Sequence, residues 1–254
     1  MIIDKEKFEQ IEKLILKDIN LIKLGFQHLE YMQDCNRGVF YRETEDKYDA
    51  INYGFGYNLH NLDPITVCKE DIASYVSFKS VEKILDAILP NSRTYGSFGD
   101  SLEFILYCED TLANVMKPDI NSPNELTHEK VFENGQMVLS NITEAVSNMN
   151  AYIQKHHLTF FDNFLTIQDL NDKILEKYDW TNWSKYFFKE PFFKAIIIMK
   201  LCNNNKKYDE FTKMYKTRIY NAIQNGRDDL LTYYENLIKV IEYLESGKYK
   251  EVAI

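Results

Sequence analysis

The spacing of hydrophobic residues changes once along the chain, and this change constrains the fold more than any other feature. From about residue 40 to residue 78, apolar and polar residues tend to alternate, as in Tyr53-Gly54-Phe55-Gly56-Tyr57. From Val81 onward, apolar residues recur every three or four positions. Alternation places side chains on opposite faces of a strand, whereas the longer spacing lines one face of a helix. The sequence therefore predicts an α+β protein with an N-terminal antiparallel β-meander and a packed helix, followed by a larger all-helical region of antiparallel helices.

The N-terminal region is predicted to begin with a helix over 4–24. Phe8, Ile11, Ile15, Ile19 and Ile22 form one apolar stripe of this helix, which we expect to lie against the sheet, and Gly25 is well placed to end it. The predicted strands span 29–32, 38–44, 48–60, 65–68 and 72–78, of which the last two form either separate strands or one bulged strand. A short helix over 80–89 ends at a proline.

The remainder of the chain is predicted to be helical. A polar, glycine-containing segment over 91–99 marks the best boundary, so we expect a sheet domain over 1–90 and a helical domain over 91–254, either separate or packed as one globular unit. The predicted helices span 100–116, 127–157, 166–178, 191–202, 208–224 and 228–245. Thr166 with Asp169 has the spacing of a capping box.

Charge and composition exclude several classes of function. The 254 residues carry a net charge of −9 and contain no basic run longer than two residues, which disfavours nucleic-acid binding and suits either solubility or a basic partner. The longest apolar run, Ala195 to Met199, is far shorter than the ~20 residues of a membrane-spanning helix. The N-terminal residues are charged early and do not resemble a secretory signal, so we expect a cytoplasmic protein.

No pattern in the sequence predicts catalysis or a cofactor. The adjacent His156 and His157 are predicted to end a helix, where a protonated imidazole is favourable without any catalytic role. The four cysteines lie far apart, and we expect them to be unpaired thiols. We expect no metal, since the only conceivable zinc ligands, His28, Cys35, His60 and Cys68, lack the spacing of a zinc clip.

Four carboxylates gather beside a predicted hairpin turn, at Glu43, Glu45, Asp46 and Asp49. An exposed turn does not desolvate carboxylates, so it is a poor place for acid–base catalysis. Two interpretations remain open: a solvated charged turn, or a docking surface for a basic partner.

Aromatic residues are densest between positions 180 and 193, and this segment contains both tryptophans of the chain. Trp180, Trp183 and Tyr186 are the candidate binding residues, because tryptophan and tyrosine are enriched at the energetic centres of protein interfaces. Such a cluster also packs the core of a domain or joins two domains. The sequence leaves both interpretations open, and Trp183→Ala distinguishes them, because it unfolds the protein only if Trp183 belongs to the core.

Residues 1–90 resemble small uncharacterised bacterial domains, some of them encoded beside polymorphic toxins as immunity proteins. The resemblance rests on the first helix, Leu24-Gly25-Phe26, Gly38-Val39-Phe40-Tyr41-Arg42 and the strand around Ile51-Asn52-Tyr53-Gly54. It implies stoichiometric binding of a partner and no catalytic residues.

We therefore expect a non-enzymatic protein-binding protein, most concretely an immunity-type inhibitor that binds and occludes a basic toxin domain. Two alternatives remain: a helical scaffold or regulatory module that docks a peptide, and an enzyme whose site assembles only in three dimensions.

Overall fold

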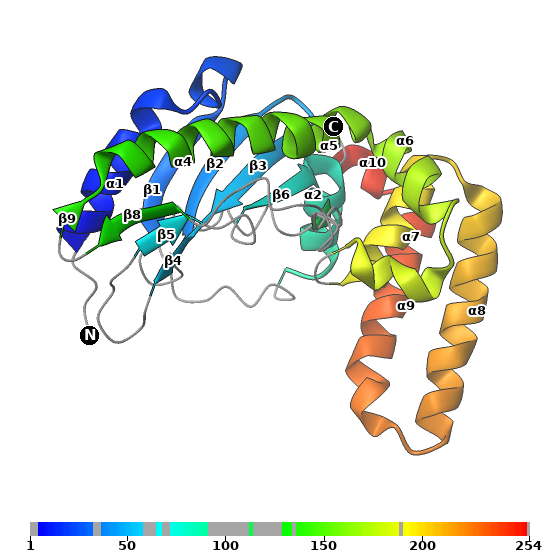
Figure 1. Cartoon of the computed structure of the whole chain (residues 1–254). Helices are drawn as coiled ribbons and strands as arrows, with labels where there is room; N and C mark the ends of the chain where they lie inside the picture. Colours follow the sequence, from blue (N-terminus) through cyan, green and yellow to red (C-terminus); the bar gives the residue numbers. More distant parts are fainter. Residues whose placement is uncertain are drawn as a thin grey trace. The chain divides into compact units, whose positions relative to one another are not determined.

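The computed structural model describes most of the chain, as two compact units. The described residues are 5–32, 37–57, 65–67, 72–90, 112–113, 129–133, 136–187 and 190–252. Contacts within the chain group residues 1–75 and 114–163 into one unit, here called the sheet unit, and residues 76–113 and 164–254 into the other, the helical unit (Figure 1). The predicted α+β class is confirmed. The predicted division at residue 90 stays a prediction, because residues 91–111 lie outside the described residues.

Most of the strands belong to the sheet unit, and strand β6 (Ala73–Phe78) spans the division between the units. The other elements of the sheet unit are α1 (Lys5–Asp18), the 3-10 turn η1 (Ile22–Leu24), β1 (Gln27–Met32), β2 (Arg37–Glu43), β3 (Lys47–Tyr53), β4 (Phe55–Tyr57), β5 (Ile65–Val67), β8 (Glu129–Glu133), β9 (Gln136–Met137), α4 (Leu139–Tyr152), the π-helical turn η4 (Ile153–Leu158) and α5 (Thr159–Asn163).

The strands form two sheets. The first has the order β1-β2-β3-β6-β7, in which β7 is Leu112–Ala113, and the second has the order β4-β5-β8-β9. Strands β1, β2 and β3 form the predicted antiparallel meander. The chain changes sheets at Gly54, so the strand predicted over 48–60 is in fact β3 and β4. A glycine weakens the interior of a strand, which fits a change of sheet at this position. Strands β5 and β6 are likewise separate and lie in different sheets.

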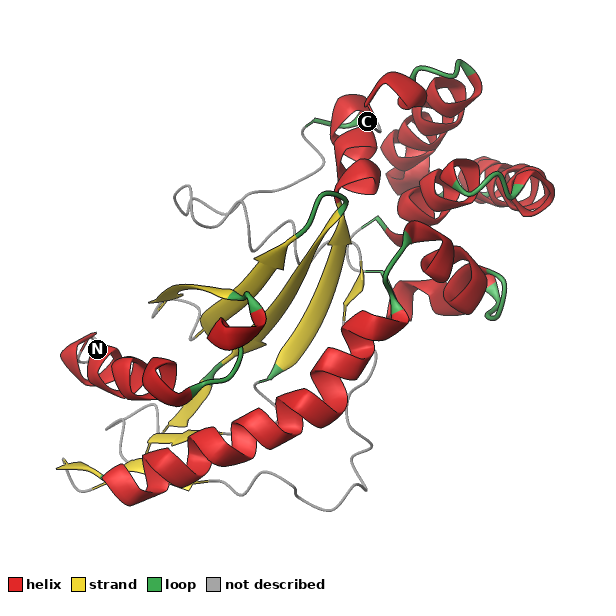
Figure 2. Cartoon of the chain, turned by 90° about the horizontal axis from the view of Figure 1, so that it is seen from above, coloured by secondary structure: helices red, strands yellow, loops and turns green. Residues whose placement is uncertain are grey.

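Helices α1 and α4 pack against each other in the sheet unit, and Figure 2 shows α4 running along the strands. In the predicted stripe of α1, Ile11, Ile15 and Ile19 are buried. Ile22 is 45% exposed, so its predicted place in the stripe is wrong. The reason is that α1 already ends at Asp18, and the chain turns before η1.

Two local interactions fix the end of this helical segment. Gly25 adopts the left-handed conformation (φ 83°) and caps η1; it does not end the first helix as predicted, because α1 already ends at Asp18. The Asn150 side chain on α4 accepts a hydrogen bond from the Asn20 backbone N–H (2.8 Å) and donates one to the Asp18 carbonyl (3.0 Å). The carbonyl end of α1 is thereby satisfied by α4.

The long helix predicted over 127–157 is wrong in its first part, where the chain forms β8 and β9. Phe132 pairs with Ile65 of β5 and with Met137 of β9, and these tertiary contacts outweigh helix propensity. The helix predicted over 100–116 is also wrong at Leu112 and Ala113, which form β7; residues 100–111 lie outside the described residues.

The helical unit follows the predicted elements closely. Its elements are α2 (Lys79–Ile88), α6 (Ile167–Leu170), the π-helical turn η5 (Asn171–Leu175), the 3-10 helix η6 (Trp180–Lys185), α7 (Pro191–Leu201), α8 (Asn205–Gln224), the 3-10 turn η7 (Asp228–Leu230), α9 (Leu231–Glu245) and α10 (Tyr249–Val252). The capping box of Thr166 and Asp169 is present and begins α6. No helix in the described part of the chain is long and apolar enough to cross a membrane.

Helix α7 is the centre of the helical unit. Every residue from Phe193 to Met199 is buried, and α7 contacts α2, α8, α9 and η6. A helix that is apolar on all sides is expected to be surrounded by other elements. The exception is Lys194, which is 1% exposed and forms an ion pair with the equally buried Glu82 of α2 (3.3 Å).

Candidate functional site

The aromatic segment of the sequence surrounds η6 in the helical unit. Asp179 begins η6, because its carboxylate accepts hydrogen bonds from the Thr181 backbone N–H (3.0 Å) and hydroxyl (2.6 Å). These bonds lower the pKa of Asp179 below its usual value. Residues three apart in a 3-10 helix lie on the same side. Accordingly, Trp180 and Trp183 both contact the ring of Phe211 on α8.

Trp183 is a core residue. Its side chain is among the largest fully buried ones, with 1% exposure, and its ring centroid lies 4.8 Å from that of Phe211. The indole N–H donates a hydrogen bond to the Tyr178 carbonyl (3.1 Å), so burial leaves this donor satisfied. For Trp183, the packing interpretation of the aromatic cluster is therefore correct.

Trp180 has a different environment, because its side chain is partly exposed. Its ring makes edge-on contacts with Phe192 and Tyr215, each at 5.9 Å between centroids, and those two rings lie 4.8 Å apart. The guanidinium of Arg218 lies 5.1 Å from the centroid of the Trp180 ring. We call the partly exposed Trp180 and Phe192, the exposed Arg218 and the buried Tyr215, whose ring contacts both aromatic rings, the aromatic surface.

Helix α8 supplies two of these four residues, Tyr215 and Arg218. It also supplies Phe211, whose ring contacts the other three aromatic rings, Trp180, Phe192 and Tyr215. Phe211, Tyr215 and Arg218 are spaced by four and three positions, so they line one side of the helix. The Tyr215 hydroxyl lies 3.2 Å from that of Tyr233 on α9, a distance at which one donates to the other. Burial raises the pKa of both phenols, which keeps them neutral at physiological pH.

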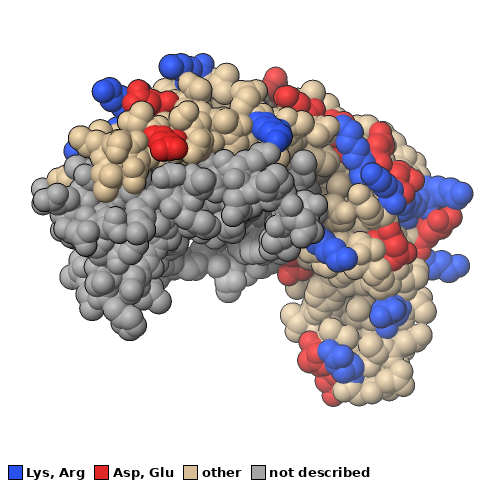
Figure 3. All heavy atoms as spheres, viewed as in Figure 1, with Lys and Arg blue, Asp and Glu red and all other residues tan. Residues whose placement is uncertain are grey.

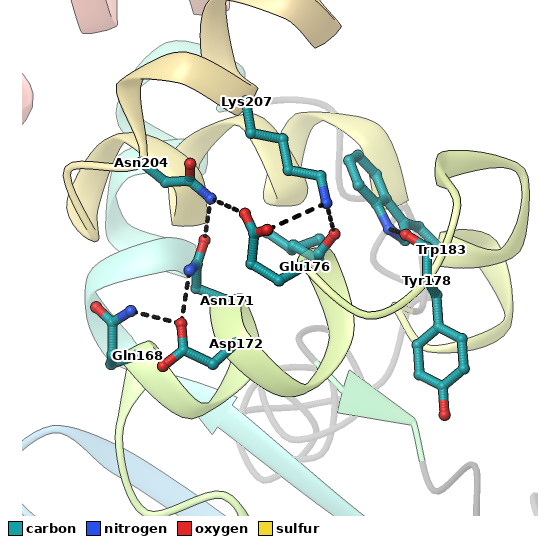
Figure 4. A network of polar contacts seen from close by, with 9 residues as sticks. Gln168, Asn171, Asp172, Glu176, Tyr178, Trp183, Asn204 and Lys207 are labelled. Atoms are coloured by element: carbon teal, nitrogen blue, oxygen red, sulfur yellow. Dashed lines mark hydrogen bonds and ion pairs between the residues drawn. The ribbon is translucent and has the colours of Figure 1, made fainter.

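A network of polar contacts holds the turn before α8 against the segment that leads into η6 (Figure 4). The Asn204 amide donates to Asn171 Oδ1 (2.9 Å) and to Glu176 Oε1 (2.6 Å). Lys207 donates to the Leu175 carbonyl and lies 3.9 Å from the Glu176 carboxylate. These bonds link η5, which precedes η6 in the chain, to the start of α8, so they connect the neighbourhoods of two elements that carry the aromatic surface.

Tyr186, the third predicted aromatic residue, lies apart from this surface. Its ring stacks on that of Tyr178, with 4.8 Å between centroids. Burial raises the pKa of Tyr186 to about 12, and the neighbouring Tyr178 acts in the same direction. The structure thus separates the three predicted residues into a core residue, a surface residue and a member of a second stack.

Of the four carboxylates predicted to gather at an exposed turn, three are exposed in the structure and one is buried. Glu43, the last residue of β2, and Glu45 and Asp46 in the turn that follows it are exposed. Asp49 is fully buried, so its assignment to a docking surface is wrong. The register of the hairpin places Asp49 opposite Arg42, whose guanidinium lies 2.7 Å away, and the Lys47 ammonium lies 2.8 Å from the other carboxylate oxygen.

Two histidines of the sheet unit, the fully buried His157 and the largely buried His28, were not recognised from the sequence as structural groups. His28 Nε2 lies 2.8 Å from the Tyr53 hydroxyl, which donates to Glu12 Oε1 (3.3 Å). His157 contacts the Ser74 hydroxyl through Nδ1. Burial lowers the pKa of each histidine to about 4, and for His157 the charge of His156 adds to this effect. Both imidazoles are therefore neutral at pH 7.

The contact of Ser74 with His157 has the chemistry of a nucleophile and a base. Ser74 is 0% exposed and His157 is 1% exposed. Since a substrate cannot reach either group in this arrangement, we assign the pair a structural role, in which β6 is joined to η4. The sequence predicts that His157 ends a helix. In the structure it instead lies buried within η4, which continues into α5.

Metal-ligand chemistry is not assembled in the described part of the chain, where no group of three or more histidine, cysteine, aspartate or glutamate side chains could hold an ion. Of the four conceivable zinc ligands only His28 is described, and Cys35, His60 and Cys68 lie outside the described residues. Cys202 is an unpaired thiol, and burial raises its pKa to about 11. A thiol with such a pKa is a poor nucleophile at pH 7.

On the face drawn in Figure 3, the charges of the described residues are mixed in sign, with Lys and Arg interspersed with Asp and Glu. Interspersed charge of this kind does not form the basic stripe that binds nucleic acid.

Comparisons with known proteins give no relative for this chain. No family model, no curated protein and no solved structure matches it.

Proposed function

We propose that this chain is a non-enzymatic protein-binding protein, and that it binds its partner through the aromatic surface of the helical unit. The observation that carries the proposal is the partly exposed Trp180 ring, framed by Phe192 and Tyr215 and covered by Arg218. Tryptophan, tyrosine and arginine are the residues most enriched among those that dominate binding energy.

The packing around this surface supports the same proposal. Trp183 anchors η6 in the core, and the network around Asn204 and Glu176 joins η5 to α8. A surface that is ordered before binding loses less conformational entropy on association. Partly exposed aromatic rings on a rigid scaffold are typical of such pre-organised interfaces.

A photo-crosslinking experiment in cells of the native source tests this proposal. A benzophenone amino acid replaces Phe192 in the aromatic surface, and the control position is Tyr220 on α8, which is 49% exposed. We expect one specific cross-linked protein from position 192 and none from position 220. Trp180→Ala should abolish the cross-link while circular dichroism shows an intact fold. Equal cross-linking from both positions, or none from 192, would contradict the proposal.

A second surface supports a more specific function, the occlusion of a basic toxin. Glu43, Glu45 and Asp46 present three exposed carboxylates at the end of β2 and in the turn that follows it, within the segment that resembles immunity domains. We propose that this turn attracts a basic partner. The triple substitution of these residues by lysine should slow association with the cross-linked partner and remove its salt dependence. An unchanged association rate would exclude a role for the turn.

A further inference from the structure

We infer that the aromatic surface is a receptor for a carboxylate that a partner protein presents beside an apolar side chain. This inference rests on the proposed function and names the chemistry of the partner. It starts from Arg218, an exposed residue of α8 whose guanidinium lies over the Trp180 ring at 5.1 Å. Guanidinium groups stack on aromatic rings and keep their N–H donors at the edge of the plane, where they can bind a carboxylate in a bidentate manner.

The donors of Arg218 are not used within the described part of the chain. The other two arginines with described side chains each bind a carboxylate: Arg42 lies 2.7 Å from Asp49, and Arg227 lies 2.7 Å from Asp229. Arg218 forms neither an ion pair nor a hydrogen bond with any described residue, and its one described contact is the Trp180 ring. It is therefore a cation positioned by an aromatic ring and not neutralised by a carboxylate.

The nearby carboxylates have other roles. Asp179, next to Trp180, accepts hydrogen bonds from Thr181 and caps η6. Burial raises the pKa of Glu190, and the charge of Lys194 partly opposes this shift. Neither forms an ion pair with Arg218, so a carboxylate from another molecule meets no competitor bound to the guanidinium.

The ring beside the guanidinium determines what else the ligand must carry. Trp180 is partly exposed and is fixed by edge-on contacts with Phe192 and Tyr215. An apolar group attached to the carboxylate can pack against this ring and exclude water from the ion pair, which strengthens it. A phosphate group would normally be met by several cations. Lys207, which belongs to the same helix as Arg218 and lies over the Trp183 ring, is bound to the Leu175 carbonyl and lies near Glu176.

An NMR titration of the full chain tests the inference with N-acetyl-phenylalanine as the probe, a carboxylate joined to an aromatic group. The matched probe is N-acetyl-phenylalanine amide, which has the same ring and no charge, and inorganic phosphate is the third probe. We expect the carboxylate to shift the Trp180 indole N–H and Arg218 Nε–H signals in a saturable way. The amide and phosphate should bind at least tenfold more weakly.

Two variants separate the role of Arg218 from a general effect of charge. Arg218→Gln should abolish the preference for the carboxylate over the amide, and Arg227→Gln, which removes an exposed arginine already paired with Asp229, should leave it unchanged. Equal binding of both probes, tighter binding of phosphate, or an unchanged preference in Arg218→Gln would overturn the inference. If Arg218→Gln still cross-links its partner at position 192 and Trp180→Ala does not, the carboxylate inference fails and the proposed function stands.

Discussion

The two units of the chain differ in their buried titratable groups: each buries an ion pair, Asp49 with Lys47 in the sheet unit and Glu82 with Lys194 in the helical unit, but among the described residues only the sheet unit also holds neutral histidines. The sheet unit buries His28 and His157 as neutral imidazoles. The helical unit buries Glu82 and Lys194 as an ion pair, with at most 1% of either side chain exposed. Protonation of a buried neutral base destabilises the fold, because the charged form is costly to bury. A buried ion pair destabilises the fold when either of its charges is removed, because the other charge is left unpaired. The comparison teaches that both units should be sensitive to truncation of a buried charge, whereas acid should act first on the sheet unit, through its histidines.

Removal of the Lys194 ammonium is expected to cause the largest loss of stability among the tests of this comparison. Lys194→Ala leaves the Glu82 carboxylate buried without its ion-pair partner, a change that typically costs about 3 to 5 kcal/mol, and the lost aliphatic stem adds to it. Urea unfolding followed by tryptophan fluorescence reports on the helical unit, because both tryptophans lie there. The double variant Glu82→Leu/Lys194→Met is the control and should recover most of the stability. A single variant as stable as the parent would show that the pair is not buried in solution.

The two tryptophans give the next largest contrast. Trp183→Ala should lower the free energy of unfolding by about 3 to 5 kcal/mol, because it opens a cavity in the core. Trp180→Ala removes a partly exposed ring and should cost less than about half as much. Chemical denaturation with circular dichroism measures both values. Equal losses would mean that Trp180 is as much a core residue as Trp183.

A pH titration of stability sharpens the comparison in the sheet unit. The pKa of His157 is about 4 in the folded state and about 6.5 when unfolded, so the stability it contributes is present above pH 6.5 and is lost as pH falls toward 4. The full effect is roughly 3 kcal/mol at 1.36 kcal/mol per pKa unit. His28 acts in the same direction. Hydrogen exchange of β3 amides should accelerate over this range, and His157→Phe should reduce the acceleration. Exchange that is independent of pH, after correction for intrinsic rates, would contradict buried neutral histidines.

Substitution of Gly38, in the sheet unit, is expected to cause the smallest loss of stability among these tests. A Cβ atom at this position would lie 2.1 Å from the Tyr53 ring, the ring that links His28 to Glu12. Gly38→Ala should therefore displace Tyr53 and cost about 1 to 3 kcal/mol, as other overpacked cores do. Gly226→Ala is unsuitable as a control because of its positive φ, so Ala87→Ser on the exposed face of α2 serves instead. A fully stable Gly38→Ala would mean that Tyr53 can move at no cost.

Much of the architecture could be predicted from the sequence, because hydrophobic spacing and caps are local signals. The capping box at Thr166 and the starts of the C-terminal helices are such cases. The hairpin of β8 and β9 was missed although the sequence between the two strands is Asn134-Gly135, which is typical of two-residue hairpin loops; these two residues lie outside the described residues. The apolar residues around it fit both periods, and only pairing with β5 decides between strand and helix.

The candidate site could be located from the sequence but not resolved into roles. Trp180 and Trp183 are equally prominent in the segment, and their difference depends on which of them faces the interior at α8. Asp49 was assigned to the surface because its neighbours are exposed, yet the cross-strand register places Arg42 opposite it. Contacts between residues distant in sequence decide both cases, and a single sequence contains no direct record of them.

The different roles of the two tryptophans are tested most directly by acrylamide quenching of fluorescence in two single-tryptophan variants. Trp183→Phe retains only Trp180, and Trp180→Phe retains only Trp183. We predict strong quenching of Trp180, which is partly exposed, and almost none of Trp183, which is 1% exposed. Equal quenching of the two residues in folded protein would contradict the assignment of Trp183 to the core and of Trp180 to a binding surface.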